Sequence, residues 1–154
     1  MIVLRALVPT DAPAVRRVYS GAAVTFLGRR AMTDREAVEY VLHAAEWAAA
    51  DPTVQYVLGV DVAGDLLGLV KLGHRPGGHG RVGYVLRDDS WGRGYATAAV
   101  RELARFAFTN AGFLSLGAKH HPGNTASGRV LVKAGFTRLG IRDGMVEYML
   151  AARG

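Results

Sequence analysis

The pattern of hydrophobic and polar positions predicts one strand and two helices in the first 50 residues. The loosely alternating stretch 2–8 indicates a strand, and a short helix is expected directly after it. A second helix is predicted up to residue 50, because Thr33 and Glu36 form a capping box in front of apolar residues at helical spacing. Its inner face is predicted to hold Val38, Val41, Leu42, Ala45 and Ala49.

The middle of the chain has the pattern of an antiparallel meander. The stretches 54–60 and 66–72 are rich in branched residues and flank a short polar segment containing Gly64, which is typical of a β-hairpin. A flexible turn over 73–80 then leads to a third strand over 81–86. These three strands are expected to pair in chain order.

Helices and strands alternate in the second half. A helix over 95–110 carries a continuous apolar stripe, and a strand over 114–118 follows it, so a parallel crossover is expected between this strand and the previous one. A helix over 124–134 and a hairpin of 136–141 with 145–150 complete the chain. This order predicts an α+β fold, with a central mixed, mostly antiparallel sheet flanked by helices.

Composition narrows the class of protein. A length of 154 residues suits a single domain, 1–154, and 50% hydrophobic with 21% charged residues is a globular composition. No apolar run is long enough to cross a bilayer and the N-terminus has no secretory signal, so we expect a soluble cytoplasmic protein without membrane attachment. The absence of cysteine excludes a thiolate nucleophile and a Cys-type metal site.

The net charge of +6 favours anionic partners. A nucleic acid and a polyphosphate cofactor both meet that description. The arginines are scattered along the chain and form no block with interleaved aromatic residues, so nucleic acid is not the expected partner.

A tight glycine turn over 91–96 joins the strand at 81–86 to the helix at 95–110. The free N–H groups and the positive dipole end of a helix N-terminus attract anions, and glycines let a ligand approach the main chain. The turn is therefore predicted to bind a phosphate or pyrophosphate, with Arg93 adding a charged contact. It is neither a Walker loop nor a GxGxxG motif, and a purely structural connection is the alternative.

A second motif sharpens this prediction. WGRGYAT at 91–97 is followed some thirty residues later by NTASGRVLVKAGF at 124–136, and LRALVPTDAPAV stands near the start of the chain. Together these stretches resemble the GCN5-related N-acetyltransferase (GNAT) superfamily, most closely the RimJ/RimL-type branch that acetylates N-terminal amines of ribosomal proteins. The resemblance implies an acyl-CoA N-acyltransferase fold and acetyl-CoA (coenzyme A) as the cofactor.

The resemblance also implies where the cofactor binds. The amides of residues 92–96 would hold the pyrophosphate, and the pantetheine arm would run beside the strand end at 85–87, next to Asn124. The implied cofactor-binding residues are Val85, Leu86, Arg87, Trp91, Gly92, Arg93, Gly94, Tyr95, Ala96, Thr97, Asn124 and Ser127.

Two catalytic roles follow from the same resemblance. Leu131 stands where many relatives carry a tyrosine that protonates the leaving thiolate, so Ser127 is the candidate general acid; a serine that hydrogen-bonds locally at a helix start is the alternative. The amine would attack the thioester directly, without an acyl-enzyme. A backbone N–H at Val85 or Leu86 would stabilise the oxyanion of the tetrahedral intermediate.

The acceptor amine must be neutral when it attacks. With pKa values of about 10.4 for lysine and about 8 for an α-amine, deprotonation at pH 7 costs about 4.6 or about 1.4 kcal/mol, respectively. The strand at 81–86 carries no carboxylate that could serve as a base. This favours an α-amine, as at a protein N-terminus, or a small-molecule amine of low pKa.

Other residues near the expected cleft have two interpretations each. The candidate bases, acting directly or through water, are His74, His79, His120 and His121, which also fit ordinary surface histidines. Tyr84 is expected either to line the cleft or to belong to the core. Glu36 and Glu39 could meet a cationic substrate or form a solvated helix face. The HHP sequence at 120–122 lacks the further ligands of a metal site, so no metal is expected.

The acceptor is expected to contact two segments, 21–32 and 74–80. It would be a small-molecule, peptide or protein amine, and the protein would be a monomer or a homodimer. A catalytically inactive acyl-CoA-binding module is the alternative function, favoured by the missing tyrosine at Leu131 and opposed by Ser127.

Overall fold

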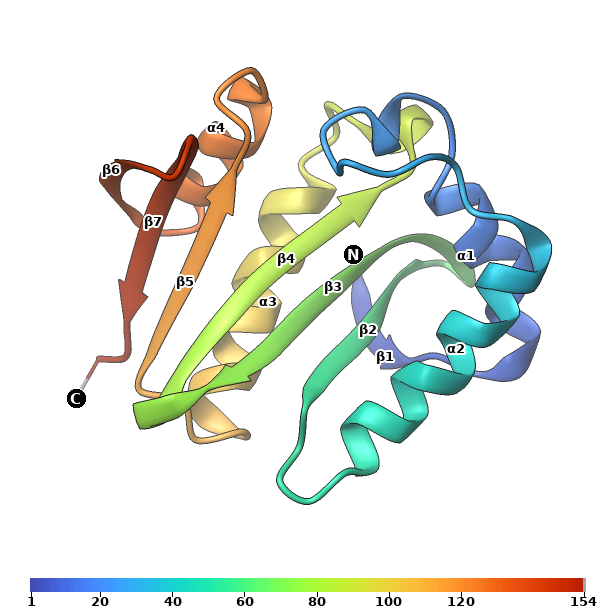
Figure 1. The fold of residues 1–154 in the computed structure, drawn as a ribbon, viewed down its shortest axis with the longest axis horizontal. Coiled ribbons are helices and arrows are strands. Elements are labelled where there is room, and N and C mark those ends of the chain that lie inside the picture. Colours follow the sequence, from blue (N-terminus) through green and yellow to red (C-terminus); the bar gives the residue numbers. More distant parts are fainter. Residues whose placement is uncertain (154) are drawn as a thin grey trace.

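Seven strands form one sheet in the computed structural model, which describes residues 1–153 (Figure 1). The strands are β1 (Val3–Ala6), β2 (Gln55–Val62), β3 (Asp65–Arg75), β4 (His79–Leu86), β5 (Ser115–His120), β6 (Thr137–Arg142) and β7 (Met145–Ala151). Their order across the sheet is β1-β2-β3-β4-β5-β7-β6, and only β4 and β5 pair in parallel. The predicted meander, parallel crossover and terminal hairpin are therefore confirmed.

Helices cover both faces of this sheet. They are α1 (Ala12–Val18), α2 (Asp34–Ala49), α3 (Tyr95–Thr109) and α4 (Thr125–Lys133). One core joins α1 and α2 to alternate residues of the central strands, among them Leu69 and Val85. The other joins α3 and α4 to the opposite face, through Val70 and Val82. In Figure 1, α3 runs behind the central strands and α1 and α2 lie together on the other side.

The second helix keeps its predicted cap but turns a different face inward. Thr33 Oγ1 accepts a hydrogen bond from the Glu36 N–H, and Glu36 Oε1 accepts one from the Thr33 N–H. Val38 and Leu42 are 50% and 52% exposed, and Ala45 and Ala49 are exposed as well, so the predicted inner face is wrong except at Val41. The buried row is Ala37, Val41 and Ala44. Two alanines in this row let α2 lie close to the sheet, which a row of larger side chains would prevent.

The turn predicted over 73–80 is also shorter than expected. Strand β3 continues to Arg75, and its pairing with β4 extends to Arg75 opposite His79. Only the short 3-10 turn Pro76–Gly78 connects the two strands, with Gly77 at φ +77°. Cross-strand pairing thus orders a segment whose composition suggested a flexible loop.

The sheet opens between β4 and β5. The two strands pair over three register positions only, from His79 opposite Ser115 to Arg81 opposite Gly117. Beyond this point their ends diverge, as Figure 1 shows. The main-chain groups on this side of the end of β4 are consequently left without a neighbouring strand.

No helix within residues 1–153 is long and apolar enough to cross a membrane.

Candidate functional site

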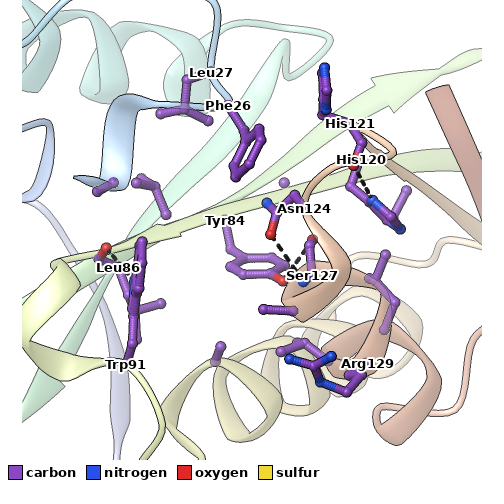
Figure 2. Close-up of a pocket in the computed structure, with 18 of the residues that line it drawn as sticks. Phe26, Leu27, Tyr84, Leu86, Trp91, His120, His121, Asn124, Ser127 and Arg129 are labelled. Atoms are coloured by element: carbon purple, nitrogen blue, oxygen red, sulfur yellow. Dashed lines mark hydrogen bonds between the residues drawn. The ribbon is translucent and has the colours of Figure 1, made fainter. Parts of the chain in front are cut away.

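A cavity of about 810 Å³ occupies the opening between β4 and β5. Its wall comes from the end of β4, the glycine turn before α3, the segment after α1, the start of α4, and the end of β5 with the loop after it. Single side chains of α2 and β3, Tyr40 and Lys71, also contribute. Figure 2 shows Phe26 and Leu27 on one side of this cavity and Trp91, Tyr84 and Ser127 below them. The predicted cofactor-binding turn and the predicted acceptor segment 21–32 therefore line one space.

The glycine turn presents main-chain N–H groups to the cavity. Gly92 and Gly94 have φ values of +76° and +81°, and a Cβ added to either would meet nothing within 4 Å. Their backbone conformation, rather than crowding, therefore requires glycine. The first main-chain hydrogen bond of α3 runs from the Ala98 N–H to the Gly94 carbonyl. The preceding N–H groups of residues 95–97 have no acceptor within the helix, as expected for an anion site.

The Trp91 indole ties the turn to the end of β4. Its Nε1 donates to the Leu86 carbonyl oxygen at 3.1 Å, while the side chain remains 53% exposed. This hydrogen bond sets the distance between the predicted pyrophosphate site and the strand beside which the pantetheine arm is expected to lie.

Main-chain direction separates the two candidate oxyanion donors. The Arg87 N–H donates to the Leu67 carbonyl at 2.9 Å, so Arg87 and, by strand alternation, Val85 turn their N–H groups toward β3. Tyr84 and Leu86 turn theirs toward the opening. Of the two predicted oxyanion donors, the Leu86 N–H is therefore the one that faces the opening, while the Leu86 carbonyl beside it accepts from Trp91.

Two arginines predicted to contact the cofactor do not line the cavity. Arg87 binds Asp89 and Asp65 through its guanidinium, and its pKa is raised, first of all by the hydrogen bond to Asp89. Arg93 is exposed to solvent. Arg87 thus holds the turn in place from outside the cavity.

Ser127 meets Tyr84 rather than its own backbone. The Tyr84 Oη donates to Ser127 Oγ at 2.9 Å, and Asn124 Oδ1 accepts the Ser127 N–H at 3.3 Å as the cap of α4 (Figure 2). Burial raises the pKa of Tyr84, so its hydroxyl keeps its proton well into the alkaline range. The sequence left Tyr84 open between cavity and core, and the structure places it in the cavity wall.

Leu131 has no hydroxyl group and cannot donate a proton to a leaving thiolate. Its side chain is 1% exposed and belongs to the core beneath α4. The Tyr84 hydroxyl comes instead from the opposite wall, on β4.

Both histidines in the cavity wall use ring nitrogens in hydrogen bonds within the protein. His120 is buried, with Nδ1 2.7 Å from the His121 carbonyl and Nε2 3.1 Å from the Tyr148 hydroxyl. A carbonyl only accepts, so Nδ1 carries the proton and Nε2 accepts from Tyr148. The Nδ1 of His121 accepts the Gly123 N–H at 2.9 Å, and its ring lies 5.2 Å from that of Phe26. Both rings therefore have structural partners.

His74 and His79 do not reach the opening. They flank the β3–β4 turn, His74 near the end of β3 and His79 at the start of β4. Since a strand rises about 3.3 Å per residue, His79 is roughly 23 Å from Leu86 along β4. His79 Nδ1 lies 2.8 Å from Ser115 Oγ instead. The prediction that 74–80 contacts the acceptor is wrong, because this turn is at the far end of the strands. The segment 21–32 does line the cavity, through residues that include Phe26 and Leu27.

Glu36 and Glu39 of α2 also lie outside the cavity lining. Glu36 is part of the helix cap and pairs with Arg29 and Arg30. Hydrogen bonding by the Thr33 backbone lowers its pKa. Glu39 pairs with Arg35, and both side chains are exposed. The solvated-face interpretation is therefore the one that the contacts support.

The chain matches one protein family over most of its length. A family model described as an acetyltransferase (GNAT) domain covers residues 2–137. The uncharacterized N-acetyltransferase p20 of Bacillus licheniformis is 34% identical over 64 residues, which are 42% of this chain and 36% of that relative. The chain thus aligns with about a third of that relative's length.

Solved acetyltransferase structures share the fold at low identity. RimJ of Mycobacterium smegmatis, in complex with a CoA disulfide, has a TM-score of 0.81 at 23% identity, covering 98% of this chain and 82% of that one. RimL, a ribosomal α-N-protein acetyltransferase in complex with coenzyme A, has a TM-score of 0.84 at 15% identity, with coverage of 97% and 93%. Spermidine N-acetyltransferase of Vibrio cholerae, with CoA and spermine, has a TM-score of 0.81 at 14% identity, with coverage of 97% and 95%. The names of these neighbours give acceptors that range from a ribosomal protein to a polyamine.

Proposed function

Since this chain belongs to the GNAT acetyltransferase family, we propose that it transfers the acetyl group of acetyl-CoA directly to a primary amine. The acceptor is a protein N-terminal α-amine or a small-molecule amine. The observation that carries the proposal is the Tyr84–Ser127 hydroxyl pair, 2.9 Å apart, at the opening where β4 and β5 separate.

The residues around the opening fit acetyl-CoA. The N–H groups from Gly92 to Thr97 suit a pyrophosphate, because the turn is open to solvent and both glycines have the conformation that exposes these groups. The unpaired edge of β4 suits the amide groups of a pantetheine arm, which then takes the place of a neighbouring strand. Asn124 lies beside this edge, with its side-chain oxygen engaged in the α4 cap.

When bound, acetyl-CoA supplies a thioester whose carbonyl carbon accepts the amine. A C–N bond forms, the C–S bond breaks, the amine loses a proton and the departing sulfur gains one. The Leu86 N–H is placed to donate to the carbonyl oxygen as negative charge develops there. Ser127 Oγ is placed to give its proton to the sulfur, and Tyr84 Oη to replace that proton through their hydrogen bond.

The absence of a strong base supports an amine of low pKa. No Asp or Glu of residues 1–153 lines the cavity, and both histidines there are engaged by structural partners. An α-amine loses its proton at a cost of about 1.4 kcal/mol at pH 7, which needs no dedicated base. A lysine side chain, at about 4.6 kcal/mol, is a poorer acceptor for such a site.

Thiol release from acetyl-CoA tests the proposal. A panel containing N-terminal peptides, small amines and a lysine side chain blocked at its α-amine should show turnover with α-amines first. If CoA binds but no amine in the panel releases thiol, the protein is an acyl-CoA-binding module and the proposed activity is wrong.

A further inference from the structure

The charged side chains of the cavity wall are all cationic. They are Arg29, Lys71, Lys119, Arg129 and Lys133. Within residues 1–153 no carboxylate faces them across the cavity. A cofactor pyrophosphate at the glycine turn would account for cations near α3 and α4. Lys71 on β3 and Arg29 after α1 do not belong to those helices and need another explanation.

The two faces of the sheet separate these cations into groups. Tyr84 packs against the core under α3 and α4, where Ser127 and Arg129 also lie. Lys71 is on the opposite face of β3, since it alternates with Val70 and its ammonium lies over the rings of Tyr19 and Tyr40. Lys71 and Arg29, which share the Tyr19 ring, thus lie on the α1 and α2 side of the sheet, away from Ser127 and Arg129.

Lys71 is held in place without a counter-ion. Its Nζ lies 5.6 Å from the centroid of Tyr19 and 5.5 Å from that of Tyr40, and no carboxylate in the described part of the chain forms an ion pair with it. The Arg29 guanidinium carbon also lies over the Tyr19 ring, 5.4 Å from its centroid. Its ion pair with Glu36 is long, at 3.5 Å. Two aromatic rings therefore position cationic groups that face the cavity.

Gly83 leaves space for a ligand beside Lys71. The two residues are direct partners in the β3–β4 register, so their side-chain positions are on the same face of the sheet. A Cβ at Gly83 would meet nothing within 4 Å, and its φ is not positive. The glycine is required neither by packing nor by backbone conformation. It leaves open the part of the wall between Lys71 and the Leu86 N–H.

We propose that the acceptor is a primary amine that carries an anionic group, a carboxylate or a phosphate, a few bonds from its nitrogen, and that Lys71 and Arg29 bind this group beside Gly83. The inference rests on the proposed acetyl transfer and names its substrate class. Polyamines are poor acceptors for the same reason, since each added cation faces Lys71 at close range.

Four acceptors test the charge preference: the C-terminally amidated tripeptides Ser-Asp-Ala, Ser-phosphoserine-Ala and Ser-Lys-Ala, and spermine. The wild type should use the two anionic peptides with kcat/KM at least about tenfold above Ser-Lys-Ala and spermine, which corresponds to about 1.4 kcal/mol. The first two peptides distinguish carboxylate from phosphate. Equal or better turnover of the cationic acceptors overturns the inference and leaves acetyl transfer intact, whereas no thiol release with all four overturns both.

Two variants, with one control, test whether the charge preference for the acceptor comes from Lys71 and the space at Gly83. Lys71→Glu should remove or invert the ratio of kcat/KM between Ser-Asp-Ala and Ser-Lys-Ala, while the Kd for CoA stays unchanged. Arg142→Glu, an exposed residue of β6, changes the net charge equally and should keep the wild-type ratio. Gly83→Val should raise KM for every acceptor, since it fills the space with a side chain that strands tolerate well. An unchanged ratio in Lys71→Glu contradicts the proposal.

Discussion

Tyr84 and Ser127 are 43 residues apart in the chain, and their hydroxyl oxygens are 2.9 Å apart. One belongs to β4 and the other to the first turn of α4, so the pair bridges the opening between β4 and β5. The core beneath α4 is filled by Leu131, so the proposed proton source at this opening is the Tyr84–Ser127 pair.

Removal of the Ser127 hydroxyl tests the general-acid role. Ser127→Ala should lower kcat by about 10²-fold, because the departing sulfur loses its proton donor, while the Kd for CoA changes little. Steady-state kinetics and calorimetry measure the two effects separately. Ser115→Ala, which removes a hydroxyl at the far end of β5, is the matched control and should retain the wild-type kcat. An unaffected kcat in Ser127→Ala would mean that another group protonates the sulfur.

The alkaline limb of the pH profile reports on Tyr84. Burial favours the neutral phenol over the phenolate, so the pKa of Tyr84 lies above its ordinary value of about 10. A group that must stay protonated is lost only as the pH rises through its raised pKa, so kcat should show no alkaline fall up to about pH 10. A fall in kcat between pH 8 and pH 9 that disappears in Tyr84→Phe would contradict this.

Substitution of the second turn glycine tests the cofactor site. Gly94→Glu should weaken CoA binding by about 2 kcal/mol or more, about 30-fold in Kd, because it places a negative charge against the pyrophosphate. Gly144→Glu is matched in conformation, at φ +79° against +81°, and also meets nothing within 4 Å, but it lies in the β6–β7 turn. Only Gly94→Glu should raise the Kd in calorimetry. Equal affinities in the two variants would remove the turn from the cofactor site.

An ion-pair cluster outside the cavity links stability to pH. Arg5 binds Asp11 at 2.8 Å and Asp61 at 2.8 Å, and these hydrogen bonds lower the pKa of both carboxyl groups. A lowered pKa in the folded state adds stability above the unfolded value of about 4, and this stability is lost as the pH falls through the folded value. The free energy of unfolding in urea should therefore drop between pH 5 and pH 2. The drop should be smaller in Asp11→Asn, and an identical drop in wild type and variant would exclude the contribution of Asp11.

The sequence predicted the order of elements and the glycine turn before α3 because both depend on local patterns, and cofactor binding by this turn stays a prediction. Strand alternation, the Thr33 cap and the spacing of Gly92 and Gly94 act over a few residues. The inner face of α2 was less predictable, since the buried row depends on how closely Ala37 and Ala44 let the helix approach the sheet.

The chemistry of the cavity depended on pairs that no local pattern encodes. Tyr84 meets Ser127, His120 meets Tyr148 and Lys71 meets Tyr40 through the topology of the sheet. The alternation of β4 indicates which face of the sheet carries Tyr84. Its partner Ser127 could not be predicted, because it depends on where β5 separates from β4 and places α4. The cytoplasmic location and the monomeric or dimeric state stay predictions.

The most direct measurement follows thiol release and acceptor mass together, with acetyl-CoA and an acidic N-terminal peptide. Direct transfer predicts one free thiol for each acetylated α-amine, no acetyl group left on the protein, and a parallel loss of both signals in Ser127→Ala. Thiol release without an acetylated peptide, or a protein that carries the acetyl group between two half-reactions, would contradict it.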